Sequence, residues 1–385
     1  MKRFVTALAS ALIGLTAGAQ YYQDAVNVEM LRHLGHDAWF RKEIVMPQVG
    51  GYNVYKADLH THTVFSDGWV LPDFRVAEAW QDGLDVMAVT EHIEYRPYDK
   101  VFADNLKEFV NQETTADLGA SDGRKMDLNY SVNRSLKAAE GYDITIIPGT
   151  EITRSGTYVG HFNALFTSDN NLVYDEDPVK AVRNAKAQNA VVMHNHPGWT
   201  RKNIDFTEAE KVIYAEGLVD GVEVMNGGEF YPGVIDRVRE RGLFIAANSD
   251  IHSSTAIDYK DGGNLRPMTL IFAKDRSLES LKEALLAGRT LAYGFYTLCG
   301  DEQLLKDFFL ACIQVKVIRE KDDRYDLMIT NSTSVPFTLQ KTGSNYVKLS
   351  PFTSIRLSFS KNDMKVTVLN MFCSADRHPV VEIAL

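Results

Sequence analysis

The chain has 385 residues, of which 45% are hydrophobic, and its formal net charge is −10 at pH 7. This length is enough for one large domain with a small one, or for two to three domains. The acidic balance argues against extended nucleic acid as a partner, because such binding depends on lysine and arginine neutralising phosphates. A small phosphate compound, held by local arginines and metal ions, stays open as a ligand.

Residues 1–19 have the pattern of a secretory signal peptide. Lys2 and Arg3 form a basic start, the mostly apolar stretch 4–15 is too short to span a bilayer, and residues 17–19 form an A-x-A-like cleavage site. An ordinary buried N-terminal helix is the alternative. No later stretch is long and apolar enough for a membrane helix, so we expect an exported protein, periplasmic or secreted, without membrane insertion.

Short apolar runs alternate with helical patterns over residues 50–298. Runs this short and this apolar are typical of strands buried on both faces. The alternation predicts a parallel α/β arrangement, and the segment 99–131, which lacks a strong period, is expected to be a long insertion. The predicted strands are 86–89, 144–147, 162–166, 190–193, 221–225, 243–247 and 268–272, and the predicted helices are 72–81, 132–140, 178–188, 207–216, 234–241 and 278–287.

Metal-type ligands follow these apolar runs. Seven of the ten histidines lie, together with carboxylates, in such positions. Imidazole and carboxylate together are the ligands of zinc, manganese or iron. A closed β/α barrel carries its active site at the carboxyl ends of its strands, and ligands from five or more strands converge there more easily than on an open sheet. The segments are 58–68, 90–92, 149–151 with His161, 194–197 and 249–252.

Two of these segments have a spacing suited to holding one ion. His60 and His62 are two residues apart, which in a strand places both side chains on the same face. Asp250 and His252 repeat this arrangement. Glu151 follows another apolar run, and its two carboxylate oxygens could bridge two ions.

The pattern changes after about residue 300. Alternating strand-like segments separated by turn residues predict a small antiparallel β-sandwich, so we expect one domain over 20–300 and another over 301–385. An odd number of cysteines leaves at least one unpaired; we expect Cys299, Cys312 and Cys373 to be small buried hydrophobes, with one disulfide left open. The predicted strands are 313–318, 325–330, 337–341, 354–359 and 365–369.

The order of these ligands resembles a known family. The segments 58–68 (Asp-Leu-His-Thr-His-Thr-Val-Phe-Ser-Asp-Gly) and 89–92 (Val-Thr-Glu-His) closely resemble the first two motifs of the PHP (polymerase and histidinol phosphatase) superfamily. The resemblance covers roughly residues 50–298, and parts of it are similar to the exported phosphodiesterase branch. It implies a distorted seven-stranded β/α barrel with two or three divalent ions, manganese, iron or zinc. The segments 149–152, 160–163, 196–198 and 248–252 resemble the later motifs.

The resemblance also implies how the ligands divide among the ions. Glu151 would bridge the first and second ions, and Glu91 departs from the aspartate that usually precedes the histidine. The first ion would be held by His60, His62, Glu151 and Asp250, the second by Glu151, His161 and His196, and the third by Asp67, His92 and His252.

Phosphate-ester hydrolysis is the chemistry that such a site implies. Two ions about 3.5–4 Å apart lower the pKa of a shared water, and the resulting hydroxide attacks phosphorus in line. Arg154 and Arg201 are candidates to bind phosphate oxygens, although a surface role for Arg201 stays open. His194 is a candidate general acid, a hydrogen-bond donor to a ligand, or a packing residue, and Glu91 would shift the ligand surroundings or supply a base.

We therefore expect a metal-dependent phosphoesterase, most of all a phosphodiesterase, acting on a small phosphate ester. Trp199 and Tyr95 would either form a wall for that substrate or serve the structure alone. A phosphomonoesterase using the same site is the alternative enzyme. A periplasmic binding protein with structural metals is the alternative from another class, and a structural site would leave no open position for water. The sequence predicts neither the metal nor the oligomeric state.

Overall fold

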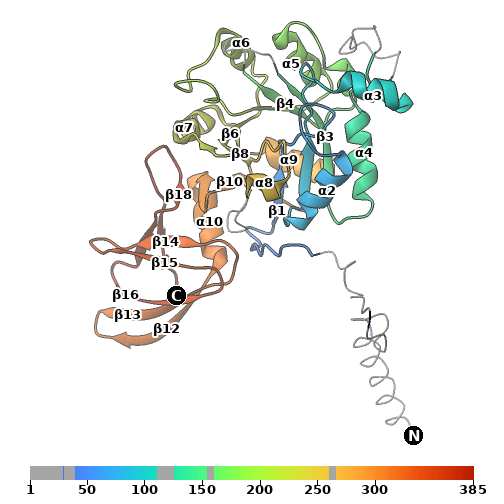
Figure 1. Ribbon diagram of the computed structural model, residues 1–385. Helices are drawn as coiled ribbons and strands as arrows, with labels where there is room; N and C mark the ends of the chain where they lie inside the picture. The colour runs from blue at the N-terminus through green and yellow to red at the C-terminus, as the bar shows by residue number, and fades with distance from the viewer. Residues whose placement is uncertain (1–28, 30–39, 111–124, 154–159, 260–265) are drawn as a thin grey trace. The chain divides into compact units, whose positions relative to one another are not determined.

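The computed structural model describes residues 29, 40–110, 125–153, 160–259 and 266–385 (Figure 1). The chain divides into two units, Met1–Lys42 and Glu43–Leu385. The second unit carries every helix and strand described below. The signal peptide predicted over 1–19 lies outside the described residues and stays a prediction. Among the residues that are described, no helix is both long and apolar enough to cross a membrane.

A curled sheet of twelve strands forms the centre of this unit. Its strands follow the order β18-β11-β10-β9-β1-β2-β3-β4-β5-β6-β7, with β8 paired to β6. Most of the central strands are buried along their whole length. The bounds are β1 Asn53–Asp58, β2 Val86–Val89, β3 Thr145–Ile152, β4 Phe162–Leu165, β5 Val191–His194, β6 Gly221–Asn226, β7 Glu229–Phe230, β8 Phe244–Asn248, β9 Met268–Ala273, β10 Thr290–Gly294, β11 Thr297–Gly300 and β18 Met371–Phe372.

The predicted barrel-type α/β fold is confirmed, with more strands than the seven expected. The strands are also not all parallel. β1, β2 and β3 run parallel, as do β5, β6 and β8, whereas β4 and β9 are antiparallel to their neighbours. The short apolar runs predicted strand positions correctly, but an apolar run has the same composition in either direction.

Threonine side chains link β8 to the strands across from it. Thr269 Oγ1 on β9 hydrogen-bonds to both the N–H and the C=O of Ala247, at 3.1 and 3.0 Å. Thr290 Oγ1 on β10 does the same for Ile245, at 3.2 and 2.7 Å. Backbone N–H and C=O groups at the outer edge of β8 therefore have hydroxyl groups as hydrogen-bond partners, as buried backbone groups require.

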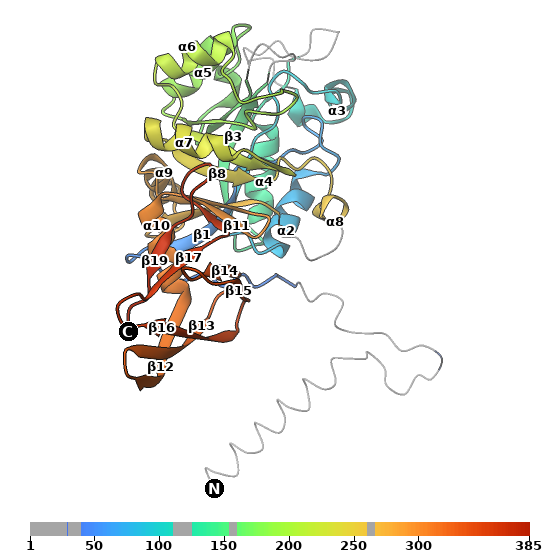
Figure 2. The same cartoon turned by 90° about the vertical axis from the view of Figure 1, so that its left-hand side faces the viewer.

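Helices cover the outside of the sheet, and each predicted helix is present (Figures 1 and 2). Local signals account for their starts: α6 has a capping box between Thr207 and Glu210, and α5 begins with Pro178 after the capping side chain of Asp177. The segment 99–131 contains two short helices, and its residues 111–124 lie outside the described part. The bounds are α2 Pro72–Gln81, α3 Asp99–Asn105, η1 Lys107–Phe109, α4 Tyr130–Ala139, η2 Asn170–Leu172, α5 Pro178–Ala187, α6 Glu208–Ala215, α7 Pro232–Arg241, α8 Thr255–Asp258 and α9 Leu278–Leu286.

Two antiparallel sheets follow the barrel, as predicted, and lie at one end of the unit (Figures 1 and 2). One hydrophobic cluster joins both sheets to α10 and to barrel strands β9 and β10. The three cysteines are buried and free, so they pack as apolar side chains. The sequence did not indicate α10. The bounds are α10 Glu302–Cys312, β12 Ile313–Lys321, β13 Arg324–Asn331, β14 Phe337–Gln340, β15 Tyr346–Leu349, β16 Ser354–Ser360, β17 Lys365–Val368 and β19 Val380–Glu382.

Candidate metal centre

His60 and His62, which follow β1, turn their rings to one point. Both side chains are fully buried. Each Nε2 atom lies 3.5 Å from Glu151 Oε2, and the two lie 3.2 and 3.1 Å from Asp250 Oδ1. Ligand atoms bound 2.0–2.2 Å from one tetrahedral ion are about 3.3–3.6 Å apart. These four side chains therefore fit the first predicted ion.

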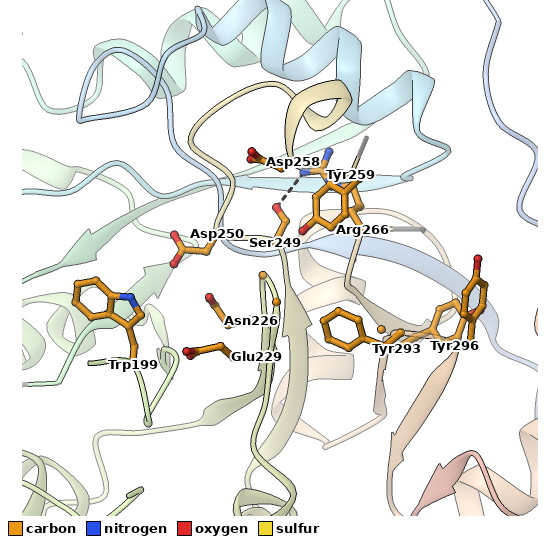
Figure 3. Close-up of a pocket in the computed structure, with 14 residues that line it drawn as sticks. Trp199, Asn226, Glu229, Ser249, Asp250, Asp258, Tyr259, Arg266, Tyr293 and Tyr296 are labelled. Carbon is orange, nitrogen blue, oxygen red and sulfur yellow. Dashed lines mark hydrogen bonds between the residues drawn. The ribbon is translucent and has the colours of Figure 1, made fainter. Parts of the chain in front are cut away.

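The other oxygens of the two carboxylates face a second position. Glu151 Oε1 lies 3.2 Å from His161 Nδ1 and 3.6 Å from His196 Nε2. Asp250 Oδ2 lies 3.7 Å from the same nitrogen of His196. Asp250, which follows β8 (Figure 3), thus reaches both positions, whereas the sequence suggested bridging by Glu151 alone. His161 precedes β4 and reaches the site because β4 runs antiparallel.

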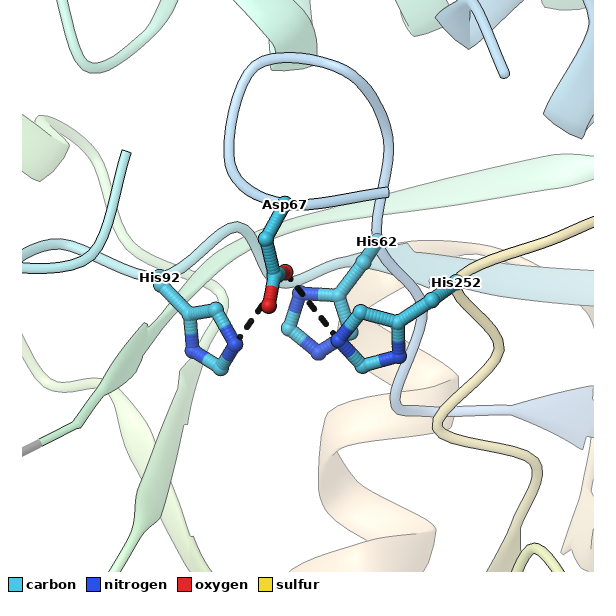
Figure 4. Close-up of side chains that lie close together, drawn as sticks. All are labelled: His62, Asp67, His92 and His252. Carbon is cyan, nitrogen blue, oxygen red and sulfur yellow. Dashed lines mark ion pairs between the residues drawn. The ribbon is translucent and has the colours of Figure 1, made fainter. Parts of the chain in front are cut away.

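Three histidines gather around Asp67 (Figure 4). Asp67 Oδ1 lies 3.3 Å from His92 Nε2 and 3.0 Å from His252 Nε2. The ring of His62 lies 4.3 Å from the rings of both histidines. His62, Asp67, His92 and His252 each offer a ligand atom, and these atoms lie within 4.8 Å of one another. The third predicted set is therefore assembled as well.

Several of the buried ligand atoms have no hydrogen-bond partner among the described residues. An unsatisfied buried polar group costs about 1–3 kcal/mol, so a cluster of such atoms indicates that another group completes them. Divalent cations satisfy this donor set of imidazole nitrogens and carboxylate oxygens. The atoms are His60 Nε2, His62 Nε2, Asp67 Oδ1, Glu151 Oε2, His161 Nδ1 and Asp250 Oδ1.

The electrostatics of the cluster also suit cations. Burial alone would raise the pKa of Glu151 and that of Asp250, but the surrounding histidines hold both well below the usual range. Burial and the nearby charges of His252 and His92 lower the pKa of His62 to about 3. At His60, His92, His196 and His252, burial would lower the pKa, but the neighbouring carboxylates outweigh it and raise the pKa of each ring. Because a metal binds neutral imidazole, cation binding would release protons from these histidines.

Glu223, on β6, holds two of the histidines in place and was not singled out from the sequence. Its Oε1 lies 3.0 Å from His60 Nδ1 and accepts a hydrogen bond from Asn248, and its Oε2 accepts from the backbone N–H of His196 and from Asn226. A carboxylate behind a ligating histidine fixes its tautomer and orientation. A glutamate inside the apolar run 221–225 was the available signal.

Two more buried polar networks support the ligands. Asp58 accepts from the backbone N–H groups of His60 and Ser249 and is paired with Arg266. Asn195 donates to Glu151 Oε1 at 2.9 Å. The sequence analysis did not single out these networks; polar side chains at the ends of predicted strands were the available signal, because such groups are buried only with partners.

Glu91 does not face the metal cluster. Its carboxylate accepts hydrogen bonds from the hydroxyl of Thr63, at 2.5 Å, and from Ser66, at 2.6 Å, and also from the backbone of Thr63. Ser66 Oγ in turn lies 3.3 Å from His62 Nδ1. Glu91 therefore fixes the loop that carries His62, and the structure does not support a role as base.

His194 and Arg201 also lie away from the cluster. The Nδ1 atom of His194 is 2.9 Å from the Tyr214 hydroxyl and its Nε2 is 3.1 Å from Glu210, both on α6. Arg201 donates to both oxygens of Glu210. These contacts agree with the packing alternative for His194 and give the Arg201 guanidinium a carboxylate partner. The general-acid role of His194 and the phosphate-binding role of Arg201 stay predictions. Arg154 lies outside the described residues.

An open cavity of about 720 Å³ adjoins the ligands. Trp199 and Tyr95, both about half exposed, line it, with Trp199 lying 5.4 Å from the rings of His161 and His196. These aromatic side chains were suggested as a substrate wall, and their position agrees with that role. A metal held here would remain accessible to water and to a substrate, unlike a closed structural site.

Known proteins resemble this chain in sequence and in fold. The PHP domain family matches residues 58–238. The crystal structure of a two-domain protein from Bacteroides vulgatus, which contains a predicted PHP-like metal-dependent phosphoesterase, is 35% identical, with a TM-score of 0.79 over 90% of this chain and 100% of that one. None of the curated proteins matches the chain.

Two more distant structures also align. An amidohydrolase from Chromobacterium violaceum is 14% identical over 51% of this chain and 87% of its own, with a TM-score of 0.36. A lesion-specific endonuclease from Pyrococcus furiosus is 14% identical over 65% of this chain and 59% of its own, with a TM-score of 0.37. These two scores are too low to support an inference about this chain.

Proposed function

Because the chain belongs to the PHP family of metal-dependent phosphoesterases, we propose that it is a phosphodiesterase that acts at the carboxyl edge of its barrel. The observation that carries this proposal is the convergence of nine ligand side chains beside an open cavity. Divalent ions held there would supply an activated water and stabilise charge on phosphate oxygens. We propose the three ligand sets described above as the sites for these ions, with Glu151 and Asp250 shared between the first two.

The lining of the cavity favours a diester over a monoester. A monoester carries up to two negative charges at neutral pH, whereas a diester carries one. Among the described residues that line the cavity there is no lysine or arginine, and Arg201 is paired with Glu210. The described part of the lining therefore offers little positive charge besides the metals, which fits the less charged ester. Trp199 and Tyr95 offer apolar surface to its organic groups.

Hydrolysis of two model esters tests this proposal. The purified protein, supplied with manganese, is expected to hydrolyse bis-p-nitrophenyl phosphate with a higher kcat/KM than p-nitrophenyl phosphate, and to lose both activities on chelation. His60→Ala should abolish turnover, because it removes a ligand of the first position. As a matched control, His378, which lies outside the site and contacts the Met371 carbonyl, is replaced by alanine.

Two results would contradict the proposal. Turnover of neither ester by the metal-loaded protein would favour the metal-containing binding protein. A kcat/KM higher for the monoester would favour the phosphomonoesterase.

A further inference from the structure

A second cavity, of about 500 Å³, lies beside the first and shares Trp199 and Asp250 with it (Figure 3). The turn between β6 and β7, the end of α8 and the turn between β10 and β11 also form its wall. β10 runs in the same direction as β1, because each is antiparallel to β9. The β10–β11 turn therefore lies at the same edge of the sheet as the metal ligands.

The charged side chains that line this second cavity are mostly acidic. Glu229 and Asp258, both exposed, line it, and within the described part of the chain neither is paired with a basic side chain. Arg266 also lines it but is only 4% exposed and is paired with Asp58 and Asp82. The net field that a ligand would meet from these residues is negative, which disfavours a group with a further negative charge.

Aromatic rings line the same space at several points along its wall (Figure 3). Trp199 lies at one end and Tyr296 at the other, and Tyr259 lies beside Asp258 (Figure 3). Phe295 and Tyr296 are the two central residues of the β10–β11 hairpin, at φ values of 52° and 56°. A two-residue hairpin of this type normally uses asparagine and glycine there. Bulky residues held in the left-handed region are rare and cluster at ligand-binding sites.

Aromatic rings and carboxylates together can bind an organic cation. The faces of Trp and Tyr attract ammonium groups, and aromatic cages recognise quaternary ammonium ligands. We propose that the second cavity is a subsite for the alcohol part of the phosphodiester, and that it selects an alcohol that carries a positively charged ammonium group. This proposal rests on the proposed function, because it assumes that a phosphodiester is hydrolysed at the metal centre. Asp250 and Trp199 line both cavities, so the subsite lies next to that centre.

A pair of substrates that differ only in charge tests the selection. The p-nitrophenyl phosphodiesters of choline and of 3,3-dimethylbutan-1-ol have nearly the same shape, because carbon replaces the quaternary nitrogen in the second. With the full-length, manganese-loaded protein, kcat/KM for the choline diester is expected to be at least about tenfold higher, the size of a desolvated cation–π and charge interaction.

Variants then locate the effect. In the double variant Glu229→Gln/Asp258→Asn the preference for the choline diester should fall to less than about threefold, since most of the attraction for the cation is removed. The matched control is Glu176→Gln/Glu240→Gln, which removes two exposed charges outside both cavities and should keep the full preference. Circular dichroism checks that each variant is folded.

Calorimetry provides a readout that needs no turnover. Choline is expected to bind the wild-type protein more tightly than 3,3-dimethylbutan-1-ol, and the Glu229→Gln/Asp258→Asn variant should lose this difference. Equal kcat/KM values for the two diesters, or equal binding of the two alcohols, would overturn the subsite. Hydrolysis of neither diester would instead overturn the proposed phosphodiesterase, while the binding comparison would still decide the charge preference of the cavity.

Discussion

At the scale of single residues, the side chains that gather at the candidate metal centre could be predicted from the sequence, whereas the polar groups that hydrogen-bond to them could not. His60 and His62 were recognisable because two histidines at spacing two followed an apolar run. Glu223 was not, because its role depends on Asn248 and on the backbone of His196, which come from other strands. His194 lies two residues from His196 and yet faces α6, a difference set by backbone direction at the end of β5.

Glu223→Gln tests the importance of the carboxylate behind His60. The substitution keeps the shape but replaces one acceptor oxygen with a donor and removes the charge. Manganese affinity is expected to fall about 10–100-fold, the usual effect of losing such a partner. The affinity is measured by titrating manganese into protein from which the metal has been removed. Glu240→Gln, at an exposed position of α7, is the control. Unchanged affinity in the Glu223 variant would show that the carboxylate does not orient the histidine.

At the scale of elements, seven strands and six helices of the barrel followed from short apolar runs and helical patterns, but β1, β10 and β11 did not, nor did the strand directions. No periodic signal marked β4 as antiparallel, so the route by which His161 enters the site was visible only in the folded chain. Helix α2 gives a second example. Its Arg75 is fully buried and donates to the backbone carbonyls of His62, Ile251, His252 and Ser253, whereas a lone arginine in a helical pattern suggests an exposed face.

Replacing Arg75 should therefore disturb the loops that carry the ligands. Arg75→Met removes the links between the segments after β1 and β8 and leaves Glu78, the salt-bridge partner of Arg75, buried without its cation. Breaking a buried pair costs about 3–5 kcal/mol, so a lower Tm and fewer manganese ions bound per chain are expected in scanning calorimetry and metal analysis.

A second arginine variant gives the control for Arg75. Arg134 forms an exposed pair with Asp73 at 2.8 Å, and Arg134→Met should cost at most about 1 kcal/mol. Equal losses of stability in the two variants, with full metal content in both, would contradict the proposed role of Arg75.

At the scale of the whole molecule, the sequence predicted a barrel followed by a small antiparallel β-sandwich. What it could not predict was the continuity between them. Leu270 and Leu291 of the barrel share one hydrophobic cluster with Phe309 of α10 and Phe337 of β14, and such contacts join residues far apart in the chain. The apolar pattern identifies buried faces but not their partners.

Metal binding should stabilise the molecule as a whole. Without cations, Glu151 is fully buried and Asp250 is partly buried, and each carries one oxygen that lacks a hydrogen-bond partner among the described residues. An ion present at about 1,000 times its Kd adds about 4 kcal/mol to the free energy of unfolding, so the Tm should fall when the metal is chelated and recover with manganese. His60→Ala should show little response to the chelator. A wild-type Tm that is the same with and without manganese would contradict this expectation.

The threonine contacts of β8 indicate how a bound metal ion would help to hold the sheet together. Below the site, Thr269 and Thr290 join β8 to the opposite strands through hydroxyl groups instead of a backbone ladder. Above them, Asp250 extends β8 while His60 and His62 extend β1. An ion bound by these side chains would be a reversible cross-link between β8 and β1, a strand in the middle of the sheet order. Without the ion, β8 would still be joined to β1, β9 and β10 by side-chain hydrogen bonds and a few backbone contacts, so the same cation would serve catalysis and add to the closure of the barrel.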